Sequence, residues 1–356
     1  IMKISFKNAV ALSLIPQILI VKWLGNHSEF VENYYSTGFY PFISGVFRIL
    51  FGWIPFSIGD LMYFALIILA LTYLYRNRKS IWKNKLSFAR NVLMILSVAY
   101  FTFHFMWGMN YYREPLADKL SLTETRDYKE LLDFTQQLIR KTNDAQLNIT
   151  NDSSLAVSIP YSQKQIFDKT IIGYDELKTI HPFLKYTTPS AKTSLFSKGL
   201  TYMGYAGYLN PFTNEAQVNG LLPNFRFPVV VGHEIGHQLG YSAENETNFI
   251  GYLVTAKNND IYFQYAAYAY ALGYCLSDIR SADKEEFNRL LSTLNPGVKN
   301  NFQEMADFWN SYENPMEPVF KSIFNSFLKA NNQTEGIRSY NAVVSLLVAY
   351  HKQHPL

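Results

Sequence analysis

Three long apolar segments stand near the beginning of the chain. They cover residues 9–24, 54–75 and 91–111, and each approaches or reaches the roughly 20 residues that a membrane-spanning helix needs. Pro16 inside the first segment is tolerated in membrane helices. A cleaved signal peptide is the alternative for this segment, but no small-residue cleavage site follows it. The pattern predicts a membrane domain over residues 1–112 with three transmembrane helices.

The region between the first and second apolar segments is also rich in aromatic and aliphatic residues. Residues 39–57 read FYPFISGVFRILFGWIPFS and contain one charged residue, Arg48. We expect an interfacial loop helix here, lying along the membrane surface and not crossing it. Asp60 and His104 lie within the predicted spans. A single histidine among aromatic residues is more typical of packing than of metal binding.

The basic residues predict the orientation in the membrane. Six of them and no acidic residue lie between the second and third segments: Arg76, Arg78, Lys79, Lys83, Lys85 and Arg90. Short loops with this excess of Lys and Arg face the cytoplasm. The predicted N-terminus is then cytoplasmic, and everything after residue 112 is extracytoplasmic.

From residue 113 onward the alternation of apolar and polar positions is typical of a soluble domain. Helical periodicity indicates a set of amphipathic helices over residues 121–141, 161–180, 284–294, 301–311, 316–328 and 336–353. A polar loop is expected over 142–154, and two short strands are expected in GYLNPF and EAQVNG. Residues 260–280 are long enough for a fourth span, but their many Tyr hydroxyls and charged ends favour a helix buried in the domain.

Composition supports this division and excludes some classes of protein. Hydrophobic residues make up 48% of the chain, aromatic residues 16% and charged residues only 17%, which is typical of a protein lying partly in a bilayer. The formal charge of +4 is modest and gives no indication of nucleic acid binding. The single cysteine, Cys275, excludes an intramolecular disulfide and a cysteine zinc cluster.

The strongest chemical pattern is HEIGH at residues 233–237. His233 and His237 are four residues apart, so on a helix both imidazole rings lie on one face and can reach one metal ion. Glu234 follows the first histidine and can act on a water at that metal. Catalytic zinc usually has three protein ligands, so a third donor is needed nearby.

The residues after this motif offer two candidates for the third ligand. Gly240 can adopt the left-handed conformation that ends a helix and reverses the chain. Glu244 and Glu246 then begin a second predicted helix, ENETNFIGYLV. We favour Glu244, because Asn248 lies one turn later on the same face and could orient a ligand, but Glu246 remains the alternative.

Other polar residues are weaker candidates. Glu215 and Asn219 lie in the predicted hairpin, which could pair with an extended substrate or be purely structural. Arg338, Tyr340 and His351 are of the types that stabilise a developing oxyanion, although packing of a C-terminal helix accounts for them equally well. His181, beside Pro182, is expected at the surface.

The chain resembles a bacterial membrane-protein family known as domain of unknown function 3810. The resemblance covers nearly the whole chain and is carried by YPFISGVFRILFGWIPFSIGD, GYLNPFTNEAQVN, HEIGHQLGYSAENETNF and SYNAVVSLL. It implies a mainly α protein with a zincin-like α+β domain over residues 113–356, containing a small sheet. It also implies a gluzincin-type site in which His233, His237 and Glu244 bind Zn²⁺ and Glu234 is the general base. Gluzincins carry Asp four residues after the ligand Glu, where this chain has Asn248.

These observations predict a membrane-anchored zinc metallopeptidase that hydrolyses peptide bonds with a zinc-activated water. The expected location is the inner membrane of a bacterium, with the catalytic domain in the periplasm. Expected partners are membrane lipid and a peptide or protein of the cell envelope. The alternatives are a metal-binding but non-catalytic scaffold that binds a partner, and a transporter with a regulatory outer domain. The latter is disfavoured because the spans contain one acid and no repeat.

Overall fold

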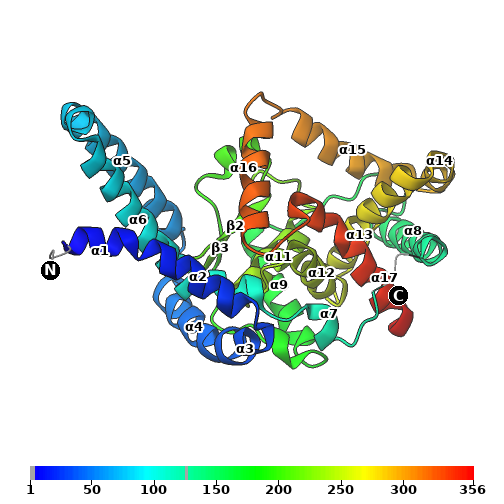
Figure 1. The fold of residues 1–356 in the computed structure, drawn as a ribbon. Coiled ribbons are helices and arrows are strands. Elements are labelled where there is room, and N and C mark those ends of the chain that lie inside the picture. The colour runs from blue at the N-terminus through cyan, green and yellow to red at the C-terminus, as the bar shows by residue number, and fades with distance from the viewer. Residues whose placement is uncertain (1–4, 125–126) are drawn as a thin grey trace. The chain divides into compact units, whose positions relative to one another are not determined.

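The computed structural model describes residues 5–124 and 127–356. By their contacts they form two compact units, and Figure 1 labels most of their helices and two of their strands. Unit 1 consists of Ile1–Glu114 and Asn210–Glu215, and unit 2 consists of Pro115–Leu209 and Ala216–Leu356. The described part of the chain is mainly helical with one small sheet, as the sequence predicts.

Unit 1 is built from helices. They are α1 (Phe6–Leu12), α2 (Leu14–Gly25), α3 (Ser28–Phe30), the π-helix η1 (Val31–Phe39), α4 (Tyr40–Phe51), α5 (Ile58–Lys83), α6 (Lys85–Met106) and the 3-10 helix η2 (Gly108–Tyr112). Three stretches are long and apolar enough to cross a membrane, namely Phe6–Gly25, α5 and α6. The helix expected over residues 39–57 is present as the shorter α4.

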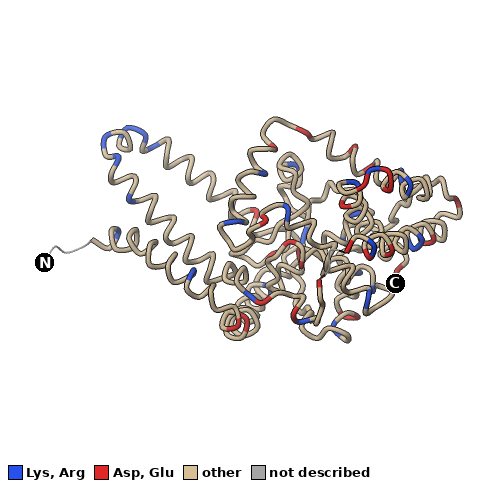
Figure 2. The backbone as a smooth tube through the Cα atoms, turned by 45° about the vertical axis from the view of Figure 1, so that its right-hand side comes forward, with Lys and Arg blue, Asp and Glu red and all other residues tan. Residues whose placement is uncertain are grey.

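The basic segment between the second and third spans was expected to be a loop, and this prediction is wrong. Helices α5 and α6 extend through it, and only Asn84 separates them. The segment contains neither Gly nor Pro, so nothing in its backbone opposes helix formation. Its Lys and Arg residues are grouped where the two helices meet, as Figure 2 shows.

Polar side chains connect the apolar helices of unit 1. The Ser13 hydroxyl lies 3.0 Å from that of Ser97 on α6, and the Gln17 amide donates to both oxygens at 3.0 Å. Hydrogen bonds of this kind hold helices together in an apolar environment, where no water competes for the donors and acceptors. A buried ion pair adds to them, because both guanidinium contacts of Arg113 to Glu32 measure 3.0 Å.

Unit 2 contains the remaining helices. They are α7 (Leu116–Lys119), α8 (Tyr128–Thr150), α9 (Gln163–Leu177), η3 (Pro182–Leu184), α10 (Ser197–Met203), α11 (Phe227–Gln238), α12 (Glu244–Ala256), α13 (Ile261–Ala282), α14 (Lys284–Ser292), α15 (Pro296–Asn310), α16 (Glu317–Ala330), η4 (Gly336–Ala342) and α17 (Val343–Gln353). Their apolar faces form one continuous core that includes Phe227, Phe249 and Phe263.

One local prediction for this part of the chain differs from the structure. The polar loop expected over residues 142–154 is largely helix, because α8 continues to Thr150 and ends at Asn151, which has φ 55°. Thr142 and Gln146 are fully buried although they are polar, and both find partners, the Thr142 hydroxyl donating to the Leu138 carbonyl. The polar residues of this segment therefore suggested a surface loop, although their side chains form hydrogen bonds inside the protein.

The sheet has three strands in the order β1 (Ala191–Thr193), β3 (Glu215–Val218) and β2 (Gly207–Asn210). The two strands expected from GYLNPF and EAQVNG are confirmed as β2 and β3, whereas β1 and helix α10 were not foreseen. Strand β1 pairs parallel to β3, with Ala191 opposite Ala216. A three-residue strand gives too short an alternation to be recognised in sequence.

Helices α11 and α12 cross in very close contact. A Cβ atom on Gly251 would lie 2.6 Å from the Val229 carbonyl oxygen and 2.9 Å from the His233 nitrogen, and one on Gly232 would lie 2.6 Å from Val254. Only glycine at both positions lets the two backbones approach this far. The crossing therefore fixes the distance between the HEIGH helix and α12.

We expect Gly251→Ala to lower the free energy of unfolding by about 1–3 kcal/mol, because the added methyl group presses on backbone atoms that cannot rotate away. Gly199→Ala on α10 is the matched control, since a Cβ there meets nothing within 4 Å. It should be neutral or slightly stabilising. Thermal unfolding of the full chain in detergent measures both variants, and equal stabilities would contradict the close crossing.

Candidate metal centre

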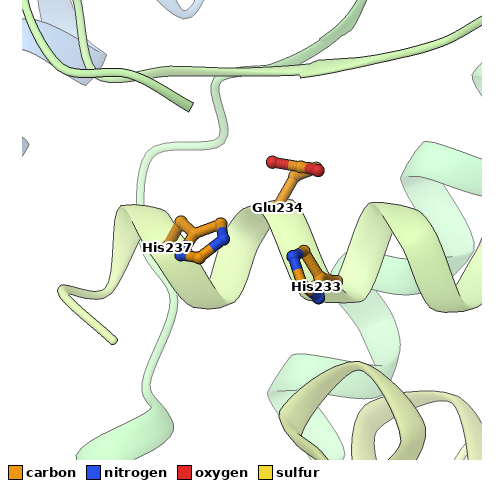
Figure 3. Close-up of side chains that lie close together, drawn as sticks. All are labelled: His233, Glu234 and His237. Carbon is orange, nitrogen blue, oxygen red and sulfur yellow. The ribbon is translucent and has the colours of Figure 1, made fainter. Parts of the chain in front are cut away.

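Helix α11 carries the HEIGH motif, and every residue in it is buried. Pro228 stands in its first turn, where the missing N–H costs no helical hydrogen bond. Figure 3 shows the rings of His233 and His237 on successive turns, with the carboxylate of Glu234 projecting between them. Ligand atoms of these three residues lie within 4.8 Å of one another, so the group could hold a metal ion.

The end of α11 orients His237. Gly240 has φ 84°, the left-handed conformation predicted from the sequence, and the Tyr241 N–H donates to the Gly236 carbonyl across this turn. The reversal brings the Tyr241 carbonyl to 2.8 Å from His237 Nδ1. A carbonyl can only accept, so Nδ1 carries the proton and Nε2 is left with a free lone pair.

The start of α12 orients His233 in the same way. The Asn248 amide oxygen lies 2.8 Å from His233 Nδ1 and accepts a second hydrogen bond of 2.5 Å from the Tyr270 hydroxyl. The Asn248 amide nitrogen lies 3.4 Å from the Tyr340 carbonyl oxygen, which fixes which end of the amide is the acceptor. Nδ1 of His233 therefore donates, and its Nε2 also presents a lone pair.

Glu244 completes this arrangement from the first turn of α12. Its Oε2 atom lies 3.4 Å from Nε2 of His233 and 3.6 Å from Nε2 of His237. No hydrogen-bond donor is found for this buried oxygen among the described residues. Three atoms that can each offer a lone pair thus converge at one point. Such a set is electrostatically unfavourable unless a cation lies between the atoms, so these residues fit a metal ion.

Glu234 lies beside this group under strand β2. Its Oε2 atom is buried and also lacks a donor among the described residues. A Cβ on Gly207 of β2 would lie 2.5 Å from Glu234 Oε1, so only a glycine at that position leaves room for the carboxylate. Burial raises the pKa of Glu234 to about 8, the His237 ring opposing and the Glu244 carboxylate adding to this effect.

The two histidines respond differently to this environment in the metal-free site. Burial lowers the pKa of His233, which keeps that ring neutral, although Glu244 acts in the opposite direction. Burial also disfavours a charged His237, but the Glu244 and Glu234 carboxylates outweigh it and raise the pKa of His237 to about 9. Burial disfavours the Glu244 carboxylate, yet His237 and His233 hold the pKa of Glu244 well below its usual range. A proton on His237 therefore takes the place of the metal charge.

Tyr340 lies beside the site, whereas the carboxylate of Glu246 has another partner. The Tyr340 ring is parallel to that of His233, with centroids 6.5 Å apart and planes 12° apart. Burial and the nearby Glu244 and Glu234 carboxylates keep the pKa of Tyr340 far above its usual range, so its hydroxyl remains protonated. Glu246, the rival third ligand, accepts a 2.7 Å hydrogen bond from the Leu116 N–H at the start of α7.

The structure gives the remaining candidates other partners. Arg338 is exposed and lies 3.7 Å from Glu335. Asn219 donates to the Thr201 hydroxyl and the Tyr205 carbonyl, and His351 contacts the Tyr252 hydroxyl at 2.7 Å. His181 is buried, contrary to the expected surface position.

Glu215 belongs to unit 1, where its carboxylate accepts from the Ile58 and Gly59 N–H groups at the start of α5. It also accepts a hydrogen bond from the Thr213 hydroxyl at 2.8 Å. An acidic side chain at the N-terminus of a helix is stabilising, since it satisfies free N–H groups and faces the positive end of the helix dipole. These contacts describe a helix cap.

Tyr270, Gly207 and the Tyr241 carbonyl were missed by sequence reasoning. Tyr270 is one of several tyrosines on α13 and lies 22 positions after Asn248, so nothing in its spacing associates it with the motif. Gly207 stands in a segment rich in Gly and Tyr, where close packing against Glu234 leaves no pattern. A backbone carbonyl leaves no trace in the residue types, although Gly240 indicates the turn that exposes it.

The affinity for a divalent metal should fall as the pH falls. Binding must displace the proton of His237, which is present below its pKa of about 9. Because each metal ion that binds releases one proton, the affinity should become about tenfold weaker for each unit by which the pH falls from 8 to 6. Competition with a chromophoric chelator, with calorimetry in two buffers of different ionisation enthalpy, measures the affinity and the protons released. A pH-independent affinity would show that His237 is neutral before binding.

Comparison with known proteins identifies the family. The chain matches the family described as "Protein of unknown function (DUF3810)" over residues 35–348, a range that includes α5, α6 and the whole metal centre. A search of curated proteins and a search of solved structures each found no match. Because the match covers most of its length, the chain belongs to the DUF3810 family of proteins of unknown function.

Proposed function

We propose that this protein is a membrane-anchored zinc metallopeptidase of the gluzincin type, with a zincin-like domain in unit 2. One observation carries the proposal: Oε2 of Glu244 lies 3.4 Å from Nε2 of His233 and 3.6 Å from Nε2 of His237, and a second buried carboxylate, Glu234, lies beside them. Two imidazoles and one carboxylate are a ligand set that catalytic zinc uses in peptidases.

The chain supplies the other parts of a hydrolytic reaction. A zinc ion held by His233, His237 and Glu244 would act as a Lewis acid toward a carbonyl group and make a bound water more acidic. Glu234 accepts the proton of the attacking water and returns it to the leaving amine. Burial raises the pKa of Glu234, and a cation held by His233, His237 and Glu244 would lower it again toward the carboxylate form that a general base needs.

Two further features of unit 2 suit an extended peptide. Strand β2 lies at the edge of the sheet, next to Glu234, and an edge strand can pair with a substrate through backbone hydrogen bonds. The protonated Tyr340 hydroxyl is the best candidate to donate to a developing oxyanion, given its position against His233 and its interaction with Glu244.

The membrane part of the proposal rests on the apolar helices and the basic residues between them. Cationic residues at the junction of α5 and α6 favour a cytoplasmic location for that end. Residues after 112 would then be extracytoplasmic, which for a bacterial inner-membrane protein means the periplasm. Peptides or proteins of the cell envelope are the proposed substrates, and membrane lipid surrounds the helices of unit 1.

We expect Glu234→Gln to retain metal and to lose hydrolysis by about a hundredfold to ten-thousandfold, the usual contribution of a general base. The amide keeps the size of the side chain but cannot accept the proton. Cleavage of a mixed peptide library by the full-length protein, followed by mass spectrometry, measures turnover, and elemental analysis measures zinc. Hydrolysis at the wild-type rate would exclude Glu234 as the base.

Glu244→Gln and Glu246→Gln form a matched pair that tests the third ligand. Removing the Glu244 carboxylate should weaken zinc binding by at least about a hundredfold, because one of three ligands is lost. Glu246→Gln should leave zinc content unchanged, since its carboxylate accepts from Leu116. Zinc loss in the Glu246 variant alone would reverse the assignment.

A further inference from the structure

A small pocket adjoins the metal centre in unit 2. It has a volume of about 260 Å³ and is lined by six residues: Arg226, Tyr270, Gly273, Tyr274, Ser277 and Asn341. These residues come from the start of α11, from α13 and from η4. The lining contains one cation and no acidic side chain. The volume suits one side chain or one chain end, since a water molecule takes up about 30 Å³ of liquid.

Arg226 is held in this pocket with its donors unused. Its guanidinium carbon lies 3.8 Å from the centroid of the Tyr270 ring, a cation–π contact that fixes the plane of the group. Within residues 5–124 and 127–356, no hydrogen bond or ion pair of its side chain is found. A fixed guanidinium with free N–H groups matches the geometry of a carboxylate, which it can bind through two parallel hydrogen bonds.

The pocket shares its wall with the support of a metal ligand. The Tyr270 hydroxyl donates to the Asn248 oxygen at 2.5 Å, and the same oxygen accepts from His233 at 2.8 Å. Arg226 precedes His233 by two turns of one helix, which is about 10 Å along the axis. An extended peptide covers that distance with about three residues.

We propose that this pocket binds a carboxylate of the substrate, about three residues from the bond that is cleaved. This inference rests on the proposed peptidase function and specifies its substrate class. The carboxylate has two sources in a peptide, the C-terminus and the side chains of Asp and Glu. In either case Arg226 forms the charged contact, and the polar groups of Tyr274, Ser277 and Asn341 surround it.

The test compares matched peptides on the full-length protein in detergent. One set ends in a free carboxylate and the other in an amide, and each is made with Asp and Glu or with Asn and Gln in their place. Wild type should cleave peptides with the recognised carboxylate with a kcat/KM about tenfold to hundredfold higher, as expected for a charge-assisted hydrogen bond. The set that shows the preference identifies the source of the carboxylate.

Three variants show whether the preference comes from the pocket. Arg226→Gln should reduce the ratio of kcat/KM for acid peptides to kcat/KM for amide peptides to about one. Arg226→Glu should instead favour peptides that carry Lys in place of the acid. Gly273→Leu should weaken binding of the acid by filling the pocket, because a Cβ at Gly273 meets nothing within 4 Å. Zinc content is measured in each variant, since an altered metal site would change cleavage of all peptides together.

Binding measurements separate this inference from the peptidase proposal. Equilibrium dialysis of the acid and amide peptides on Glu234→Gln and on the double variant with Arg226→Gln needs no turnover. If wild type and Arg226→Gln both cleave peptides without any preference for acid, the carboxylate-binding role of the pocket is overturned and the peptidase proposal stands. If no peptide is cleaved but the acid peptides bind more tightly, and Arg226→Gln abolishes this difference, the peptidase proposal is overturned and the carboxylate-binding pocket stands. Absent cleavage with equal binding of acid and amide would overturn both.

Discussion

The close crossing of helices α11 and α12 is the constraint on which the metal centre depends. Glycines at positions 232 and 251 let the helices approach so closely that a Cβ atom at either position would lie 2.6 Å from an atom of the other helix. From this contact the first turn of α12 places Glu244 opposite both histidines, and the next turn places Asn248 against His233. A larger residue at either glycine would move the candidate ligands of one helix away from those of the other. The geometry of the candidate metal centre therefore depends on the close packing of these two backbones.

The same crossing creates an electrostatic conflict that a cation resolves. Hydrogen bonds to the Tyr241 carbonyl and the Asn248 oxygen turn both Nε2 lone pairs toward Glu244. Without metal, a proton on His237 offsets part of the negative charge of the two carboxylates, which is why its pKa rises to about 9 despite burial. The residues of unit 2 therefore already lie in the arrangement that a metal ion would need, and a bound metal would replace the proton on His237.

Sequence predicted those features that depend on spacing along the chain. The HEIGH helix, the left-handed Gly240, Glu244 one turn before Asn248, strands β2 and β3 and the three apolar helices all follow from local periodicity or from turn chemistry. Contacts between distant segments could not be predicted in this way. Tyr270 reaches Asn248 from another helix, and Gly207 passes over Glu234 from a strand. Buried polar residues such as Thr142 were mistaken for a surface loop, because their partners lie within the same helix.

In the proposed peptidase, Glu234 is the residue that a metal site serving only to stabilise the fold would not need. A scaffold site needs ligands and residues that orient them, and His233, His237, Glu244, Asn248 and the Tyr241 carbonyl supply these roles. Glu234 supports none of these contacts, and its buried Oε2 atom has no donor among the described residues. A buried carboxylate without a partner destabilises the folded state, and burial accordingly raises its pKa to about 8. A glycine in β2 also leaves space for this carboxylate. A purely structural metal site would need neither the buried, unpaired carboxylate nor the glycine that makes room for it. The proton transfer that we propose for Glu234 would account for both of them.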